Sequence, residues 1–187
     1  ALCRFVMAVS SMDAATAFGG MGGSREVDIA AFVEPVSMLG ILSNTLHTGS
    51  TSLSGMTLNP DELNLTVAGV LTGIAFFLVM LAENGRIPVD NPDTHLELTM
   101  VHECMTLEYS GRLLSLIHWA SQLKLLVFLL IFSLLYFPLN LPLALKVLIG
   151  AAGISVMETL NNKMRLFKVR IYLAAAGIMM LLAVVAR

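Results

Sequence analysis

Long apolar stretches alternate with short polar ones along this chain. Five of them approach the roughly 20 apolar residues that a helix needs to cross a bilayer core of about 30 Å. They cover residues 27–46, 65–83, 113–137, 141–160 and 168–186. Before them, ALCRFVMAVSSMDAATAF predicts the second half of a further apolar helix. This fragment has neither an initiator Met nor the charged start and cleavage site of a signal peptide, so we expect a chain truncated at its N-terminus.

The composition is that of a membrane protein. Hydrophobic residues make up 57% and charged residues 13% of the chain, with a mean hydropathy of +0.82, whereas about a quarter of the residues in soluble domains are charged. We predict an all-α membrane protein: a bundle of about five to six transmembrane helices that forms a single domain over residues 1–187. The segment GGMGG at 19–23 is predicted to be a tight turn between helices, because it lacks the Lys and Ser/Thr of a phosphate-binding loop.

The basic residues are unevenly divided between the two sides of the predicted bundle. Only Arg187 falls on one side, and three basic residues lie within helices. The positive-inside rule makes the basic side cytoplasmic, so we expect a multi-pass protein of the inner (cytoplasmic) membrane. The residues on the basic side are Arg25, Arg86, Arg112, Lys163, Arg165, Lys168 and Arg170.

A long acidic loop, residues 84–112, lies on this predicted cytoplasmic side. Two interpretations stay open for it: a solvated loop that keeps helix ends wet, or a packed segment that docks a partner. Two prolines, Pro88 and Pro92, stiffen its start, and its apolar residues favour packing. In either case the acids are expected to face the cytoplasm or a cytoplasmic partner. They are Asp90, Asp93, Glu97, Glu103 and Glu108, and the apolar residues are Leu96, Leu98, Met100, Val101 and Met105.

Four charged residues fall inside the predicted spans: Glu34, Lys124, Lys146 and Glu158. Each costs roughly 2.5 to 3.5 kcal/mol near a bilayer centre, or on the order of 10 kcal/mol together if lipid surrounded them all. They are therefore expected to face protein or water, although Lys124 and Glu158 could also snorkel to an interface. Lys146 and Glu158 lie a third of a turn apart around one helix axis, so each needs a partner from another helix.

Helical periodicity places Glu34 on one face with Ser37 and Asn44, next to a possible kink at Pro35, which suits a hydrated proton site. Glu83 ends a small-residue face that also suits ordinary helix packing. Burial tends to raise the pKa of a carboxylate and lets it carry protons. The expected chemistry is proton movement without bond breaking.

Redox and metal chemistry are not expected within the chain itself. Cys3 and Cys104 stand far apart, outside any CxxC or Cys/His pattern. His118 shares a stripe with Ser115 and Gln122, and a lone membrane histidine is more often a hydrogen-bonding group than a metal ligand. No nucleic-acid-binding signature is present.

The segment AENGRIPVDNPDTHLEL, followed by EYSG at 108–111, resembles the cytoplasmic loop of membrane subunit 1 of complex I. It is similar as well to the loops of relatives in membrane-bound [NiFe] hydrogenases and formate hydrogenlyase. SSMDAATAFGGMGGSRE, FVEP and ETLNNKMRLFKVR look closer to the hydrogenase branch. The resemblance implies tilted helices at the joint between a hydrophilic redox arm and a membrane arm. Its implied partners are a [NiFe]-hydrogenase-like large subunit, an iron–sulfur small subunit and antiporter-like membrane subunits, with the [NiFe] centre and iron–sulfur clusters in those partners.

In that family, acids matching Glu34, Glu83, Asp90, Asp93, Glu97 and Glu108 belong to a polar funnel between the quinone-cavity region and the antiporter-like subunits. We add Glu103, Lys146 and Glu158 to this predicted proton relay. The residues expected at a docking surface or cavity are Arg25, Arg86, His95, His102 and Arg112.

The sequence also departs from the family pattern. His95 stands where an acid is usual, and the stretch from Leu98 to Glu108 is about three residues longer, which brings in His102 and Glu103. Because this would reshape the cavity wall, a quinone is not expected to bind.

The leading hypothesis is a non-redox membrane subunit of a hydrogenase-4-like or formate-hydrogenlyase-like complex that couples electron transfer to proton or sodium translocation. Two alternatives stay open. One is a quinone-binding subunit of an NADH- or ferredoxin-type oxidoreductase. The other is a passive membrane anchor whose acids serve docking alone.

Overall fold

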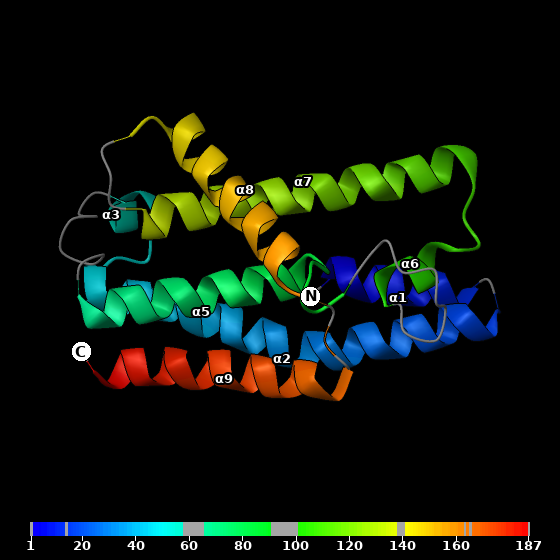
Figure 1. The fold of residues 1–187 in the computed structure, drawn as a ribbon, viewed down its shortest axis with the longest axis horizontal. Helices are drawn as coiled ribbons and strands as arrows, with labels where there is room; N and C mark the ends of the chain where they lie inside the picture. Colours follow the sequence, from blue (N-terminus) through cyan, green and yellow to red (C-terminus); the bar gives the residue numbers. More distant parts are fainter. Residues whose placement is uncertain are drawn as a thin grey trace.

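Long helices run back and forth beside one another in the computed structural model, and α8 crosses the others at an angle (Figure 1). The structure describes residues 2–13, 15–57, 66–90, 101–137, 141–162, 164 and 166–186. Every regular element in this part of the chain is a helix. The elements are α1 (Leu2–Asp13), α2 (Ala17–Thr48), α3 (Leu53–Thr57), α5 (Val67–Glu83), α6 (His102–Thr106), α7 (Gly111–Tyr136), α8 (Leu143–Leu160) and α9 (Leu166–Val185).

Five of these helices match the predicted apolar stretches. Four are long and apolar enough to cross a membrane: Ala17–Thr48, Gly111–Tyr136, Leu143–Leu160 and Lys168–Val185. The fifth, α5, is apolar and has 17 residues, about 25 Å at 1.5 Å per residue. The opening fragment forms α1, as predicted. The prediction of an all-α, multi-pass membrane protein is therefore confirmed.

The predicted turn at GGMGG is wrong, because these glycines lie in the first turns of α2. The chain reverses just before the helix, where Ala15 has a positive φ of 54° and the Thr16 hydroxyl accepts a hydrogen bond from Gly19 N at 3.3 Å. The glycines serve helix packing instead. A Cβ at Gly19 would collide with the carbonyl oxygen of Ser11 in α1, and one at Gly22 would lie 3.0 Å from Met105 Cγ in α6.

The core lies where α2, α5, α7 and α9 meet. Val33, Phe76 and Met180 are each almost fully buried there. Polar contacts also cross this apolar region. Asn44 of α2 donates a hydrogen bond to the hydroxyl of Tyr136 in α7 at 2.7 Å, and the hydroxyl of Tyr172 in α9 donates to the carbonyl oxygen of Leu78 in α5 at 3.1 Å. Of the predicted face of α2, Asn44 thus reaches another helix, whereas Ser37 donates to the carbonyl oxygen of Glu34 in its own helix. The helix also continues through Pro35 without ending.

Polar contacts link the ends of the helices. Glu158 of α8 pairs with Arg86, which follows α5, at 3.4 Å. Lys146, also on α8, donates to the carbonyl oxygen of Phe137 at the end of α7 at 3.2 Å. Each has a partner outside its own helix, as expected from their positions on α8. Asp28 of α2 and Arg170 of α9 form a further, more exposed pair at 2.7 Å.

We predict that Gly22→Val pushes α6 away from α2. Its side chain would meet Met105 and Cys104 at about van der Waals contact or closer, and overpacking of this kind costs about 1–3 kcal/mol. The thermal midpoint in detergent should fall. Cys104, which is 1% exposed, should react faster with a thiol reagent in a Cys3→Ser background.

Gly20→Ala is the matched control, because a Cβ at Gly20 meets nothing within 4 Å and Ala has the higher helix propensity. It should leave Cys104 protected and the midpoint unchanged or raised. Equal labelling of Cys104 in both variants would contradict this role for Gly22.

Candidate functional site

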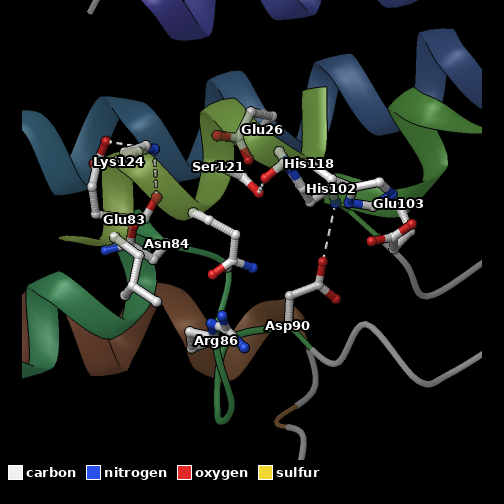
Figure 2. Close-up of a pocket in the computed structure, with 13 residues that line it drawn as sticks. Glu26, Glu83, Asn84, Arg86, Asp90, His102, Glu103, His118, Ser121 and Lys124 are labelled. Atoms are coloured by element: carbon white, nitrogen blue, oxygen red, sulfur yellow. Dashed lines mark hydrogen bonds and ion pairs between the residues drawn. The ribbon is translucent and has the colours of Figure 1, made fainter. Parts of the chain in front are cut away.

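A polar cavity of about 240 Å³ lies between the end of α5, the loop after it, and helices α2, α6 and α7. Figure 2 shows carboxylates, imidazoles and cationic groups gathered around it. Nearly all of its side chains can donate or accept a hydrogen bond. The lining residues are Glu26, Glu83, Asn84, Gly85, Arg86, Asp90, His102, Glu103, His118, Ser121, Gln122, Lys124 and Leu125.

Glu83, the last residue of α5, is the centre of an ion-pair network. Its Oε2 lies 2.9 Å from Arg4 Nη2 of α1, and its Oε1 lies 2.9 Å from Lys124 Nζ of α7. The same two cations donate to its backbone carbonyl oxygen, at 3.1 Å and 2.7 Å respectively. Arg4 Nε also lies 3.1 Å from Glu26 Oε1 of α2. Four helices therefore meet through two acids and two bases, whose charges balance; we name these four residues the Glu83 cluster.

The Glu83 cluster is largely withdrawn from solvent. The side chains of Arg4, Glu83 and Glu26 are 8%, 10% and 12% exposed, and that of Lys124 is 30% exposed. At such burial the loss of one partner leaves a charge that is neither hydrated nor paired, which is far more costly than breaking a surface ion pair. Lys124 thus binds within the protein rather than snorkelling to an interface.

The loop after α5 turns back into the bundle. Gly85 adopts a positive φ of 58°, which glycine allows without strain. Asp90 is 3% exposed, and its Oδ2 accepts hydrogen bonds from Val101 N at 3.1 Å and His102 N at 3.0 Å. The expectation that Asp90 faces the cytoplasm or a partner is therefore wrong, because its carboxylate satisfies the buried backbone at the start of α6.

The described part of the loop is packed, as its apolar residues predicted. Val101 and Met105 are each 2% exposed, and α6 lies against α2. Several residues named in the sequence analysis fall outside the described part of the chain. They are Asp93, His95 and Glu97 of the loop, Lys163 and Arg165 of the basic side, and Arg187 of the opposite side.

Glu34 does not line the polar cavity. It lies half-buried beside a second, open cavity of about 830 Å³ between α1 and α2, which we call the α1–α2 groove. The groove is mostly apolar. Its lining residues are Leu2, Arg4, Phe5, Glu26, Val27, Ala30, Ala31, Glu34, Pro35 and Met38.

The remaining predicted residues are divided among several places. Arg86, His102 and Glu103 line the polar cavity with Glu83 and Asp90. Glu158 reaches that cavity only through its ion pair with Arg86. Glu108 and Arg112 are exposed, and Arg25 lines a small separate cavity with Asp28 and Arg170. Lys146 binds at the other end of α8, next to the end of α7.

Arg4 and Glu26 belong to the cluster but not to the predicted site. Both carried a signal in the sequence. Arg4 is a charge within an apolar fragment, and Glu26 lies four and seven residues after Gly22 and Gly19, on the face of α2 that packs against other helices. Lys124 was predicted to be a charge within a span, but it was not assigned to the proton relay; the structure pairs it with Glu83.

The arrangement suits the binding and movement of protons. Carboxylates, imidazoles and water-sized space lie together, next to cations that are already paired. Among the described residues, no group of three or more His, Cys, Asp or Glu side chains could hold a metal ion. The buried Cys104 donates its thiol hydrogen to the carbonyl oxygen of Phe18.

We predict that Arg4→Met destabilises the fold by about 3–5 kcal/mol, because it leaves the carboxylates of Glu26 and Glu83 buried without the cation between them. The matched control is Arg170→Met, which breaks a pair whose side chains are 53% and 44% exposed and should cost at most about 1 kcal/mol. Denaturation in mixed micelles measures both. Adding Glu83→Gln to Arg4→Met should recover part of the loss; equal effects of the two single changes would refute the assignment.

Comparisons with known proteins agree with the sequence resemblance. The family model described as NADH dehydrogenase matches residues 1–187. Hydrogenase-4 component C of Escherichia coli (strain K12) is 36% identical over 129 residues, which is 68% of this chain and 40% of that protein. Formate hydrogenlyase subunit 4 of the same organism is 32% identical over 131 residues, or 69% of this chain and 42% of that protein. The chain thus spans less than half the length of these relatives. It belongs to the NADH dehydrogenase family, of the complex I subunit 1 type.

Proposed function

We propose that this chain is a membrane subunit at the joint between the redox arm and the membrane arm of a complex I-like hydrogenase or formate hydrogenlyase. In this role it couples electron transfer in its partners to the movement of protons or sodium ions. Members of its family are subunits of oxidoreductase complexes, and the names of the two relatives support the hydrogenase branch. The chain itself holds no redox centre in this proposal.

The Glu83 cluster is the observation that carries the proposal. A passive anchor gains nothing from two acids and two bases buried beside a polar cavity, since apolar packing is often as stable as a buried ion pair. The cavity also brings Glu83 together with His102 and Glu103 of the acidic loop. A charge that changes in a docked redox partner would alter how readily these loop groups hold protons, and Glu83 would respond through the cavity they share.

The cluster also suits a response that passes between helices. Its charges balance only while Glu83 is ionised. When Glu83 takes up a proton, Arg4 and Lys124 lose part of their attraction to α5, so the contacts of α1 and α7 with α5 weaken. A proton at one carboxylate is thereby felt by three helices, and Glu34 in the α1–α2 groove receives the change from α1 and α2.

The partners proposed are a [NiFe]-hydrogenase-like large subunit and an iron–sulfur small subunit on the loop side, with antiporter-like subunits in the membrane. Basic residues support a cytoplasmic position for the loop in the inner membrane. Arg86 follows the end of α5, Arg112 is the second residue of α7, and Lys168 and Arg170 lie in the first two turns of α9. Figure 1 shows these helix ends pointing toward the same end of the bundle.

One observation favours the quinone-binding alternative. The α1–α2 groove is open and apolar, with Arg4 and Glu34 among its lining residues, and an apolar cavity with few polar groups is typical of a small-molecule site. Extraction of the purified complex and mass spectrometry of the extract test this alternative directly.

We expect Glu83→Gln and Glu34→Gln to abolish ion movement in inverted membrane vesicles that contain the assembled complex, and to slow or uncouple electron transfer. An amide cannot exchange a proton as a carboxylate does. A pH-sensitive dye and a hydrogen- or formate-dependent electron-transfer assay measure the two activities. Asp13→Asn, an exposed acid at the end of α1, is the control. Full activity and pumping in both relay variants would reject coupling through these acids and leave the passive anchor.

Elemental analysis of the complex that copurifies with this chain should give nickel and iron, and its mass spectrum should contain the proposed large and small subunits. These metals would belong to the partners. A complex that lacks nickel and retains a quinone would instead establish the alternative.

A further inference from the structure

The polar cavity and the α1–α2 groove share one described lining residue, Glu26. The cavity contains Glu83 and the groove contains Glu34, so the two acids expected to act in sequence lie in separate spaces. We propose that Glu26 is the relay residue that passes protons between them, with Arg4 as the positioning residue. This inference rests on the proposed function, because it supplies the missing connection in that relay.

Arg4 fixes Glu26 and Glu83 on the same guanidinium group. Arg4 Nε lies 3.1 Å from Glu26 Oε1, and Arg4 Nη2 lies 2.9 Å from Glu83 Oε2. Arginine remains protonated at any working pH, so it holds the two carboxylates near each other without taking the proton itself. Arg4 Nε and Nη1 are both buried without a hydrogen-bond partner in the described part of the chain, so Arg4 holds Glu26 by ionic attraction, and Arg4 also lines the groove that contains Glu34.

Exchange of a proton between the two carboxylates leaves the net charge of the Glu83 cluster unchanged. Once one extra proton has entered, the cluster carries a net charge of +1, whether the proton is on Glu83 or on Glu26. Charged and titratable groups from several elements face these acids: Arg4 of α1, Lys124 and His118 of α7, His102 and Glu103 of α6, and Arg86 and Asp90 of the loop after α5. Arg4 pairs with both acids and Lys124 pairs with Glu83, so a proton that moves from Glu83 to Glu26 leaves Glu83 paired with two cations.

The transfer itself moves one proton and no electrons. The carboxylic acid of Glu83 releases its proton to water in the polar cavity, and the carboxylate of Glu26 accepts a proton from that water. On the groove side Glu26 then releases it to water, and Glu34 accepts it. Glu26 and Glu34 are eight residues apart on α2, about 12 Å along the axis. Because the groove is mostly apolar, the water that covers this distance must bind along the polar side chains that line it, Arg4, Glu26 and Glu34.

The test compares Glu26→Gln, Glu26→Asp and Asp28→Asn in the assembled complex in membrane vesicles. Gln removes one of the two buried carboxylates that pair with Arg4, so the thermal midpoint should fall, but by less than in Arg4→Met because Arg4 still pairs with Glu83; the partners should still copurify. Gln cannot carry the proton, so ion movement per electron transferred should fall about 100-fold, the lower end of what a placed acid–base group contributes. Asp restores a carboxylate and should recover a measurable part of the ion movement.

Asp28→Asn is the matched control. It removes the same charge from the same helix two residues away, but Asp28 pairs with Arg170 and lines neither the polar cavity nor the groove. Ion movement in this variant should equal that of the parent protein.

The outcomes separate this inference from the proposed function. Full ion movement in Glu26→Gln, with loss in Glu83→Gln and Glu34→Gln, would overturn the inference and leave the function standing. Full ion movement in all three would overturn both. If Glu26→Asp recovers no ion movement over Glu26→Gln, Glu26 serves only as a structural partner of Arg4 and the inference is wrong.

Discussion

One carboxylate, that of Glu83, holds the functional end of this molecule together. Its two oxygens bind cations from two different helices, Arg4 of α1 and Lys124 of α7, and Arg4 extends the network to Glu26 of α2. Hydrocarbon cannot solvate any of these groups, so each charge requires the others. The positions of four helices around the polar cavity therefore depend on one electrostatic balance, and a change of one proton disturbs all of them.

Small residues make this network possible. Arg4 reaches Glu26 because α1 packs closely on the start of α2, where Gly19 and Gly23 lie against Ser11. Gly22 does the same for α6, which brings His102 and Glu103 to the cavity. Asp90 then fixes the start of α6 through two backbone hydrogen bonds. The glycines thus set the distances between α1, α2 and α6, and the charged side chains of these helices can reach one another only at those distances.

The sequence predicts the spans well, because apolar length is a local property that a bilayer selects for directly. It also singles out Glu83, a charge at the end of a small-residue face. The helical conformation of the glycines at 19–23 was not predictable in the same way, because glycine permits both a turn and close helix packing. Contacts with α1 and α6 decide between the two, and the sequence does not show that these helices pack there. Asp90 likewise turned inward because of backbone groups 11 and 12 residues further on. Glu26 becomes significant only when Arg4 is seen to lie between it and Glu83.

The hydrogen bond between Asn44 and Tyr136 has a consequence for the insulation of the membrane. The buried residues of α7 are Leu129, Ser133, Leu135 and Tyr136, all in its second half, whereas Lys124 and His118 lie nearer its polar end. Asn44 binds Tyr136 in this second half of α7, and the rings of Phe76 and Tyr136 lie 5.3 Å apart beside that contact. This half of the bundle is therefore closely packed. Under the proposed function, rearrangement around a moving charge is confined to the polar end, and the packed apolar half keeps ions from crossing the subunit there.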